Sequence, residues 1–133
     1  MRLAITGTAV TLGLLLVQAP VLAHHSFFAV FDSNKPVTLR GVITKVEWLN
    51  PHIYFYVDVK DSRGNTVNWA VQIAGPQSLA RRGWTKNTLR TQDHITVMGY
   101  RARGDANVAA AREVVLSDGR KLYTGCANDG GPE

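Results

Sequence analysis

Cysteine is almost absent from this 133-residue chain, with Cys126 as its one example. A single cysteine excludes a disulfide within the chain, so a packed core must stabilise the fold, and we interpret Cys126 as an incidental thiol near a loose end. Motifs of common enzymes are also missing: we find no nucleophile elbow, phosphate-binding loop or metalloprotease helix. These absences favour a protein that is not an enzyme.

Dense positive charge is missing as well. The formal net charge is +5 at pH 7, and the only small basic groups are Arg81–Arg82 and the pair Arg101 and Arg103. A nucleic-acid-binding protein usually has a more concentrated basic patch, so we expect no nucleic-acid partner. We interpret the basic residues as a solvated surface that attracts anionic partners in a cell envelope only weakly.

Residues 1–23 have the pattern of a secretory signal peptide. Arg2 gives a positive start, an apolar run follows from Leu3 to Val17, and small or aliphatic residues end the segment at Ala23. The apolar run is too short for a stable membrane span, and no later run is longer. We therefore expect cleavage after Ala23 and an exported protein, periplasmic or secreted, that starts at His24 and has no transmembrane anchor.

After this leader, the sequence predicts one domain at residues 24–123 and a flexible, glycine-rich tail at 124–133. The apolar phase of the first strand changes at Gly41, which predicts a bend or bulge there. Pro76 and Gly83 bracket a predicted short helix at 76–82. Alternating apolar residues and turn clusters predict strands at 37–48, 53–59, 67–73, 95–98 and 110–116, with a short final strand at 121–123.

This order of elements predicts an all-β fold with one short helix, in the form of a small, five-stranded OB-fold-like barrel. The segment from Ser26 to Phe31 contains four large apolar residues. Because burying one such side chain contributes about 1.5–3 kcal/mol, we expect this segment to pack on the domain. The outward face of the second and third strands is the nearest surface for it, and the packing would hold the start of the mature chain in place.

Three histidines predict a metal site. Cleavage after Ala23 would leave His24 with a free α-amino group and an imidazole, next to the imidazole of His25. His52 follows Asn50–Pro51, where proline stiffens the loop. If the aromatic segment runs past this loop, His24, His25 and His52 supply a nitrogen-rich donor set that suits copper. The alternative is that His52 bonds backbone at the end of its strand and that the protein is metal-free.

Aromatic residues suggest further roles. Trp48 adjoins the proline loop and could shield His52. Tyr54 and Tyr56 share the outward face of the second strand, where an OB-fold commonly binds ligands, so they could stack on a glycan. The alternative is that both tyrosines only cover the sheet, in a structural or protein-partner module. The expected function is therefore an envelope binding or interaction module, whose partner is an envelope protein or a small ligand.

Several motifs resemble those of a known family. The resemblance rests on His24-His25-Ser26-Phe27, Trp48-Leu49-Asn50-Pro51-His52, Gly83-Trp84 and Ser117-Asp118-Gly119-Arg120. These motifs are similar to those of small exported bacterial proteins that are catalogued as a domain of unknown function, and the likeness spans nearly the whole chain after the leader. The family implies no activity that can be transferred. One difference is the turn before the fourth strand, which resembles Pro-Gly-Asp in relatives and is Thr91-Gln92-Asp93 here.

Overall fold

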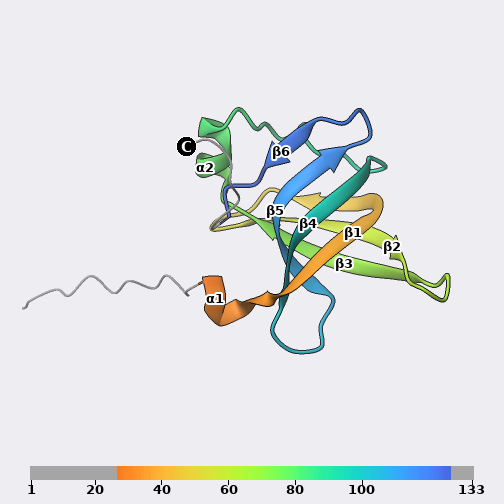
Figure 1. The fold of residues 1–133 in the computed structure, drawn as a ribbon. Helices are drawn as coiled ribbons and strands as arrows, with labels where there is room; N and C mark the ends of the chain where they lie inside the picture. Colours follow the sequence, from red (N-terminus) through yellow and green to blue (C-terminus); the bar gives the residue numbers. More distant parts are fainter. Residues whose placement is uncertain (1–26, 127–133) are drawn as a thin grey trace, which may run out of the picture.

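β1 (Phe31–Glu47) is the longest strand and pairs with strands on both of its sides. The computed structural model describes residues 27–126, whose arrangement is shown in Figure 1. Along these residues the elements are α1 (Phe27–Val30), β1, β2 (Ile53–Lys60), β3 (Thr66–Ile73), α2 (Pro76–Arg81), β4 (His94–Ala102), β5 (Val108–Leu116) and β6 (Lys121–Tyr123). The predicted mostly-β class is confirmed, and α1 is a second short helix that the pattern did not predict.

The strands form one six-stranded sheet in the order β3-β2-β1-β4-β5-β6. β1 pairs antiparallel with β4 along its first part, up to Val42, and with β2 along its last part, from Gly41 to Glu47. β3 also pairs with β5, in parallel, with Gln72 opposite Ala110. Hydrogen-bonded neighbours therefore lead from β1 through β2, β3, β5 and β4 back to β1.

The irregularity of β1 lies two residues beyond its predicted position. The register between β1 and β2 shifts between Ile43 and Lys45, so the predicted bulge at Gly41 is wrong. Ile43 is fully buried and continues the odd-numbered phase of the core face past the glycine. Gly41 has a different role, because a Cβ there would lie 2.0 Å from the Asp58 carbonyl oxygen. Only glycine lets β1 approach β2 so closely.

The predicted end of β4, placed just before Gly99, is also wrong. The predicted strand stops at Met98, whereas β4 continues through Gly99 to Ala102. A Cβ at Gly99 would lie 1.9 Å from the Ala110 carbonyl oxygen, so this glycine permits close contact with β5 instead of ending the strand. The end of α2 agrees with the prediction, because Gly83 follows it with a φ of +83°.

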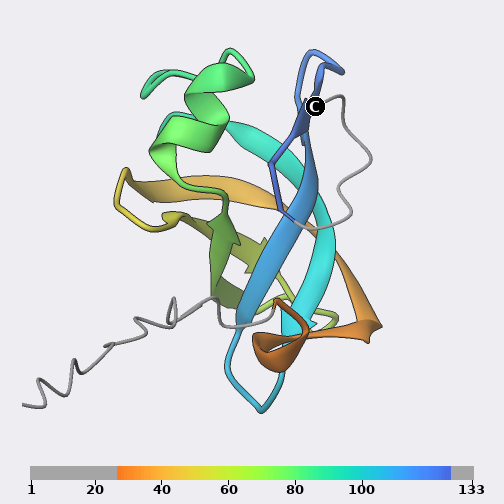
Figure 2. The same ribbon diagram turned by 90° about the vertical axis from the view of Figure 1, so that its left-hand side faces the viewer.

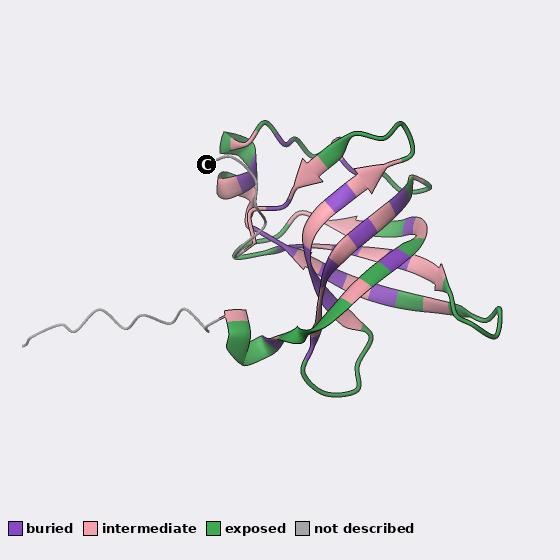
Figure 3. Cartoon of the chain, viewed as in Figure 1, coloured by how far each residue is buried: buried purple, intermediate pink, exposed green. Residues whose placement is uncertain are grey.

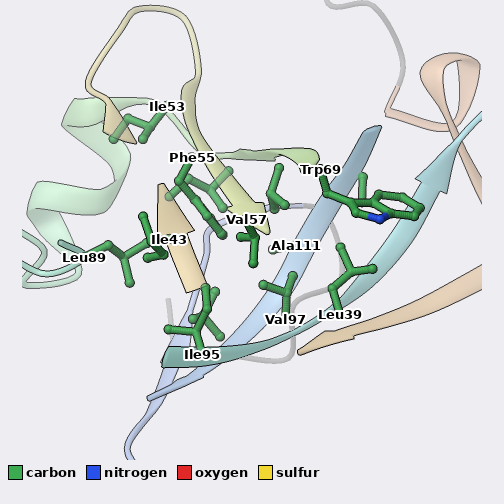
Figure 4. Close-up of a cluster of buried hydrophobic side chains, with 14 of the residues drawn as sticks. Leu39, Ile43, Ile53, Phe55, Val57, Trp69, Leu89, Ile95, Val97 and Ala111 are labelled. Carbon is green, nitrogen blue, oxygen red and sulfur yellow. The ribbon is translucent and has the colours of Figure 1, made fainter. Parts of the chain in front are cut away.

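The main core lies on the inner face of the sheet, and α2 with the segment after it covers one end (Figure 4). Buried residues alternate with more exposed ones along β2, β3 and β4 (Figure 3). Trp69, Leu79 and Trp84 are buried in this core. The largest other members are Leu39, Ile43, Ile53, Phe55, Val57, Val71, Ile73, Leu89, Ile95, Val97 and Val114.

A second, smaller cluster lies outside the main core, against α1. We call it the α1 cluster, and it consists of Phe27, Phe31, Tyr100, Ala102, Val108, Ala110 and Cys126. Phe31 is 1% exposed, and its ring centroid lies 5.1 Å from that of Phe27. Packing of the aromatic segment on the domain is therefore confirmed for these two residues, whereas Phe28 and Val30 are exposed.

The aromatic segment packs on a different surface from the expected one. Phe27 contacts the ring of Tyr100 in β4, with centroids 6.3 Å apart, instead of Tyr54 and Tyr56 in β2. The reason is the strand register, because β1 begins with Phe31 opposite Ala102 of β4. The chain therefore enters the domain over β4 and β5.

The packed domain extends beyond Tyr123, where the flexible tail was predicted to begin. Thr124 is fully buried, and its hydroxyl donates to the carbonyls of Ala111 and Arg112 in β5. Cys126 is half-buried in the α1 cluster. A tail that starts at Thr124 is therefore wrong for residues 124–126, while 127–133 and the predicted leader lie outside the described residues.

In both perpendicular views α2 lies above α1 (Figure 1, Figure 2). Neither these helices nor any other helical segment of residues 27–126 has the length and apolar character needed to cross a membrane.

Candidate functional site

One of the three predicted metal ligands, His52, lies within residues 27–126. It is exposed in the loop between β1 and β2, and the Asn50–Pro51 peptide bond before it is cis. His24 and His25 lie outside the described residues. Across residues 27–126, no three side chains of His, Cys, Asp or Glu gather into a group that could hold a metal ion. The three-histidine site therefore stays a prediction.

The loop that carries His52 is held against the start of α2. The amide of Ile53 donates to the Ala74 carbonyl at 3.3 Å. A Cβ at Gly75 would lie 2.4 Å from the Pro51 carbonyl oxygen, so glycine permits close contact between loop and helix. These contacts fix the position of the loop and leave the His52 side chain in solvent. Trp48 is half-buried against the main core, and its predicted shielding of His52 stays a prediction.

The outer face of β2 carries Tyr54 and Tyr56, as the alternation predicts. We use the name tyrosine face for these two residues with Lys45 and Glu47 of β1 and Gln72 of β3. Both tyrosines are half-buried, and both hydroxyls are hydrogen-bond donors. The Tyr54 hydroxyl donates to Oε1 of Gln72 at 2.6 Å, and the Tyr56 hydroxyl donates to Oε2 of Glu47 at 2.9 Å. Side chains from both neighbouring strands therefore hold the two rings in fixed orientations.

Glu47 is the charged centre of the tyrosine face. Its carboxylate pairs with the Lys45 ammonium, which also lies 5.4 Å from the centroid of the Tyr56 ring. The hydrogen bond from Lys45, followed by the one from Tyr56, lowers the pKa of Glu47 below its usual 4.5. In turn, the bond to Glu47 raises the pKa of Tyr56 above its usual 10.0. The carboxylate is therefore ionised and the phenol protonated at neutral pH.

Tyr54 stands where the tyrosine face meets the α1 cluster. Burial raises the pKa of its phenol, and the nearby Cys126 raises it further. The Cys126 sulfur lies 3.8 Å from the carbonyl oxygen of Gln72, the residue whose side chain accepts the Tyr54 hydrogen bond. The two surfaces are therefore continuous across β3 and β5.

This arrangement suits recognition of a ligand. Fixed, half-exposed rings can stack on a sugar or another planar group, while the carboxylate and amide beside them can bond to hydroxyl groups. Lys45 and Glu47 were not among the site residues predicted from the sequence. A signal was available, since the short connection at 48–52 implies antiparallel neighbours, which brings the outward residues of β1 opposite the tyrosines of β2.

The fold and the tyrosine face define a small, mostly-β domain with a polar and aromatic outer surface. The chain belongs to a family of unknown function, DUF6152, whose family model matches residues 12–110. Membership in a domain family of unknown function confirms that part of the resemblance, whereas bacterial origin and export stay predictions. In the comparisons, no curated protein and no solved structure matches this chain.

Proposed function

We propose that this protein is an exported binding module built on an OB-fold-like barrel. The ring of strand pairings from β1 through β2, β3, β5 and β4 supports the barrel, because an OB-fold is a five-stranded, partly open barrel. The leader-like pattern of residues 1–23 supports export to the periplasm or beyond the cell. Binding, and not catalysis, is the role that the tyrosine face favours.

The ligand that we propose first is Cu(II). Its donors would be the α-amine and imidazole of His24 and the imidazoles of His25 and His52. The observation that carries this proposal is the packing of Phe27 in the α1 cluster. His24 precedes Phe27 by three residues, a stretch that spans at most about 10–11 Å. A mature chain that begins at His24 would keep its donors close to the domain, which reduces the entropy lost when a metal binds.

The strand register supports a contribution from His52. Ala110 of the α1 cluster pairs with Gln72, and Gln72 pairs with Tyr54, two residues after His52. Neighbouring strands lie about 4.8 Å apart and a strand rises about 3.3 Å per residue, so the straight-line distance from Ala110 to His52 across the sheet is about 12 Å. Three residues of chain and two histidine side chains can span this distance.

Copper binding by the natively cleaved protein tests this proposal. The protein is expressed with its leader, cleaved in the cell, titrated with Cu(II) and followed by EPR. We expect a tetragonal, nitrogen-rich signal that saturates at about one equivalent. One residue added before His24 displaces the terminal amine and should weaken binding by about tenfold or more. Equal affinity in both proteins would contradict a site built on the amine.

Matched variants separate the donors. His52→Ala should weaken copper binding, whereas His94→Ala, which removes another exposed histidine, should leave it unchanged. Cys126→Ser should keep the affinity and so show that the thiol is not a donor. Unchanged binding by His52→Ala would restrict the site to His24 and His25. Mass spectrometry that finds a first residue other than His24 in the exported protein would overturn the copper proposal.

The tyrosine face supports a second candidate function, the binding of a glycan. The specific observation is that hydrogen bonds fix both half-exposed rings, so that stacking on a sugar costs little side-chain freedom. We expect the unaltered protein to be retained on a glycan array and Tyr54→Ala to lose retention. Tyr54→Phe keeps the ring and should retain most of the binding. Absence of retention by the unaltered protein would eliminate this candidate.

A further inference from the structure

A basic hollow lies between the C-terminal end of α2 and β6, two elements that lie above α1 in Figure 1. Its volume is about 440 Å³, within the range of small-molecule sites. We use the name basic hollow for its main lining residues, which are Arg81, Arg82, Trp84, Arg120, Lys121 and Tyr123. Four of these six residues are cationic, and two are aromatic.

Among residues 27–126, the lining of the basic hollow includes four cations and no carboxylate, so these residues make it positive. Two of its cations pair with acids at its margin: Arg120 Nε lies 2.7 Å from Asp118, and Lys121 Nζ lies 3.5 Å from Glu113. Arg81, in the last turn of α2, has no carboxylate partner within residues 27–126. An unneutralised guanidinium therefore remains even when both marginal acids are counted.

The walls of the basic hollow are held in place on both sides. On the α2 side, Gly83 turns the chain with a φ of +83°, and the Trp84 amide donates back to the Leu79 carbonyl at 3.0 Å. Trp84 is 6% exposed and belongs to the main core. On the other side, the buried Thr124 fixes the end of β6 immediately after Tyr123. The cations therefore stand on rigid backbone, which favours binding of a ligand by preorganisation.

We propose that the basic hollow binds a phosphate-bearing ligand. Guanidinium groups donate two parallel hydrogen bonds to phosphate oxygens. A phosphate monoester carries about −1.5 to −2 charge at pH 7, so it neutralises several cations better than a ligand with a single carboxylate would. Tyr123, which is half-buried, and Trp84, which is almost fully buried, also line the hollow, and they would form an apolar wall for the group that carries the phosphate. The ligand is either a free phosphorylated molecule or the headgroup of a phospholipid.

Binding of inorganic pyrophosphate to the full mature protein tests the site. Calorimetry gives the affinity, and chemical shifts of the amides of 81–84 and 120–123 give the location. We expect the Arg81→Gln/Arg120→Gln variant to bind about tenfold more weakly or worse. The matched control is Lys35→Gln/Arg63→Gln, which removes the same charge from exposed residues of β1 and the β2–β3 turn that do not line the hollow. This control should bind as the unaltered protein does.

The outcomes are distinct. Loss of affinity in the Arg81/Arg120 variant alone supports the site, whereas equal loss in both variants, or no binding of pyrophosphate, overturns it. Circular dichroism shows that each variant is folded. Cosedimentation with phosphatidylglycerol vesicles, and not with phosphatidylcholine vesicles, identifies a lipid headgroup if pyrophosphate competes with it. Binding of pyrophosphate without vesicle binding identifies a free phosphorylated ligand. Vesicle binding that pyrophosphate does not reduce would overturn the assignment to this hollow.

Discussion

Replacing Gln92 with glycine should stabilise the protein. Within residues 27–126, Gln92 is the one non-glycine residue with a positive φ, +72°. It stands in the turn before β4, where its amide donates to the Ile43 carbonyl at 2.8 Å and the Asp93 carbonyl accepts from the Ile43 amide at 3.0 Å. These two bonds tie the turn to β1 and hold Gln92 in the left-handed region.

The expected gain is the difference between two opposing contributions. A left-handed backbone costs an ordinary L-residue about 1–2 kcal/mol, and glycine removes this cost. Glycine also loses about 0.5–1 kcal/mol more than other residues through its greater freedom in the unfolded chain. The side chain of Gln92 is exposed, so its loss should change little else. The Gln92→Gly variant should therefore be more stable by about 0.5–1 kcal/mol, which raises Tm by about 3–6 °C in a domain of this size.

Two further variants control this experiment. Gln92→Ala keeps a Cβ and hence the left-handed penalty, so its Tm should match that of the unaltered protein. Gln92→Val places a β-branched side chain in the same conformation and should lower Tm. Thermal unfolding followed by circular dichroism measures all three. Equal Tm values for the glycine and alanine variants would show that the turn stores no conformational strain and would refute this reasoning.

Three other changes test the packing and the electrostatics. Phe31→Ala should lower the free energy of unfolding in urea by about 3–5 kcal/mol, because a nearly fully buried ring is lost. Val30→Ala, at an exposed position, should change this free energy little. Equal losses in the two variants would show that α1 is not anchored. Thr124→Val should lower the free energy of unfolding by about 1–3 kcal/mol in the same assay, since it removes a buried hydroxyl bonded to two carbonyls of β5. An unchanged urea midpoint would show that residue 124 belongs to a flexible tail. Tyr56→Phe should raise the pKa of Glu47 toward 4.5 in an NMR titration. Because the folded pKa of Glu47 is lowered, the stabilising effect of its carboxylate is present above pH 4.5 and is lost as pH falls through the folded pKa. This loss of stability in acid should be smaller in the variant. An unshifted pKa of Glu47 would contradict the hydrogen bond from Tyr56.

Alternation predicted the strands whose two faces differ clearly. β2 and β3 begin and end within one residue of the predicted ranges, because their inner residues are apolar throughout and a turn cluster separates them. A glycine within a strand can mark a bulge or strand end, or it can permit close contact with a neighbouring strand, and one sequence does not distinguish these roles. Gly41 and Gly99 look like a bulge and a strand end, yet both allow close backbone contact with a neighbouring strand, a requirement that appears only after the strands are paired.

The surface residues also fall into those that local alternation predicts and those that depend on how the strands pair. Tyr54 and Tyr56 were predictable on one outward face, because period-two alternation is local. The partners that fix them, Glu47 and Gln72, come from two different strands and depend on register. The aromatic segment was expected to pack on the face that carries the tyrosines, because the register that places it over β4 and β5 is not evident from the sequence. The basic hollow was harder still, since Arg81 and Lys121 are 40 positions apart and each alone looks like a solvated surface residue.

The segment from Lys121 to Cys126 links the surfaces that we propose to be functional. Its first residues line the basic hollow, Thr124 locks it to β5, a Cβ at Gly125 would lie 2.8 Å from Ala74, and Cys126 ends in the α1 cluster beside the tyrosine face. Loosening this segment would therefore disturb both surfaces at once. A Thr124 variant that lost copper and pyrophosphate binding together would reflect this shared support, and only variants confined to one surface, such as His52→Ala, can attribute a ligand to its site.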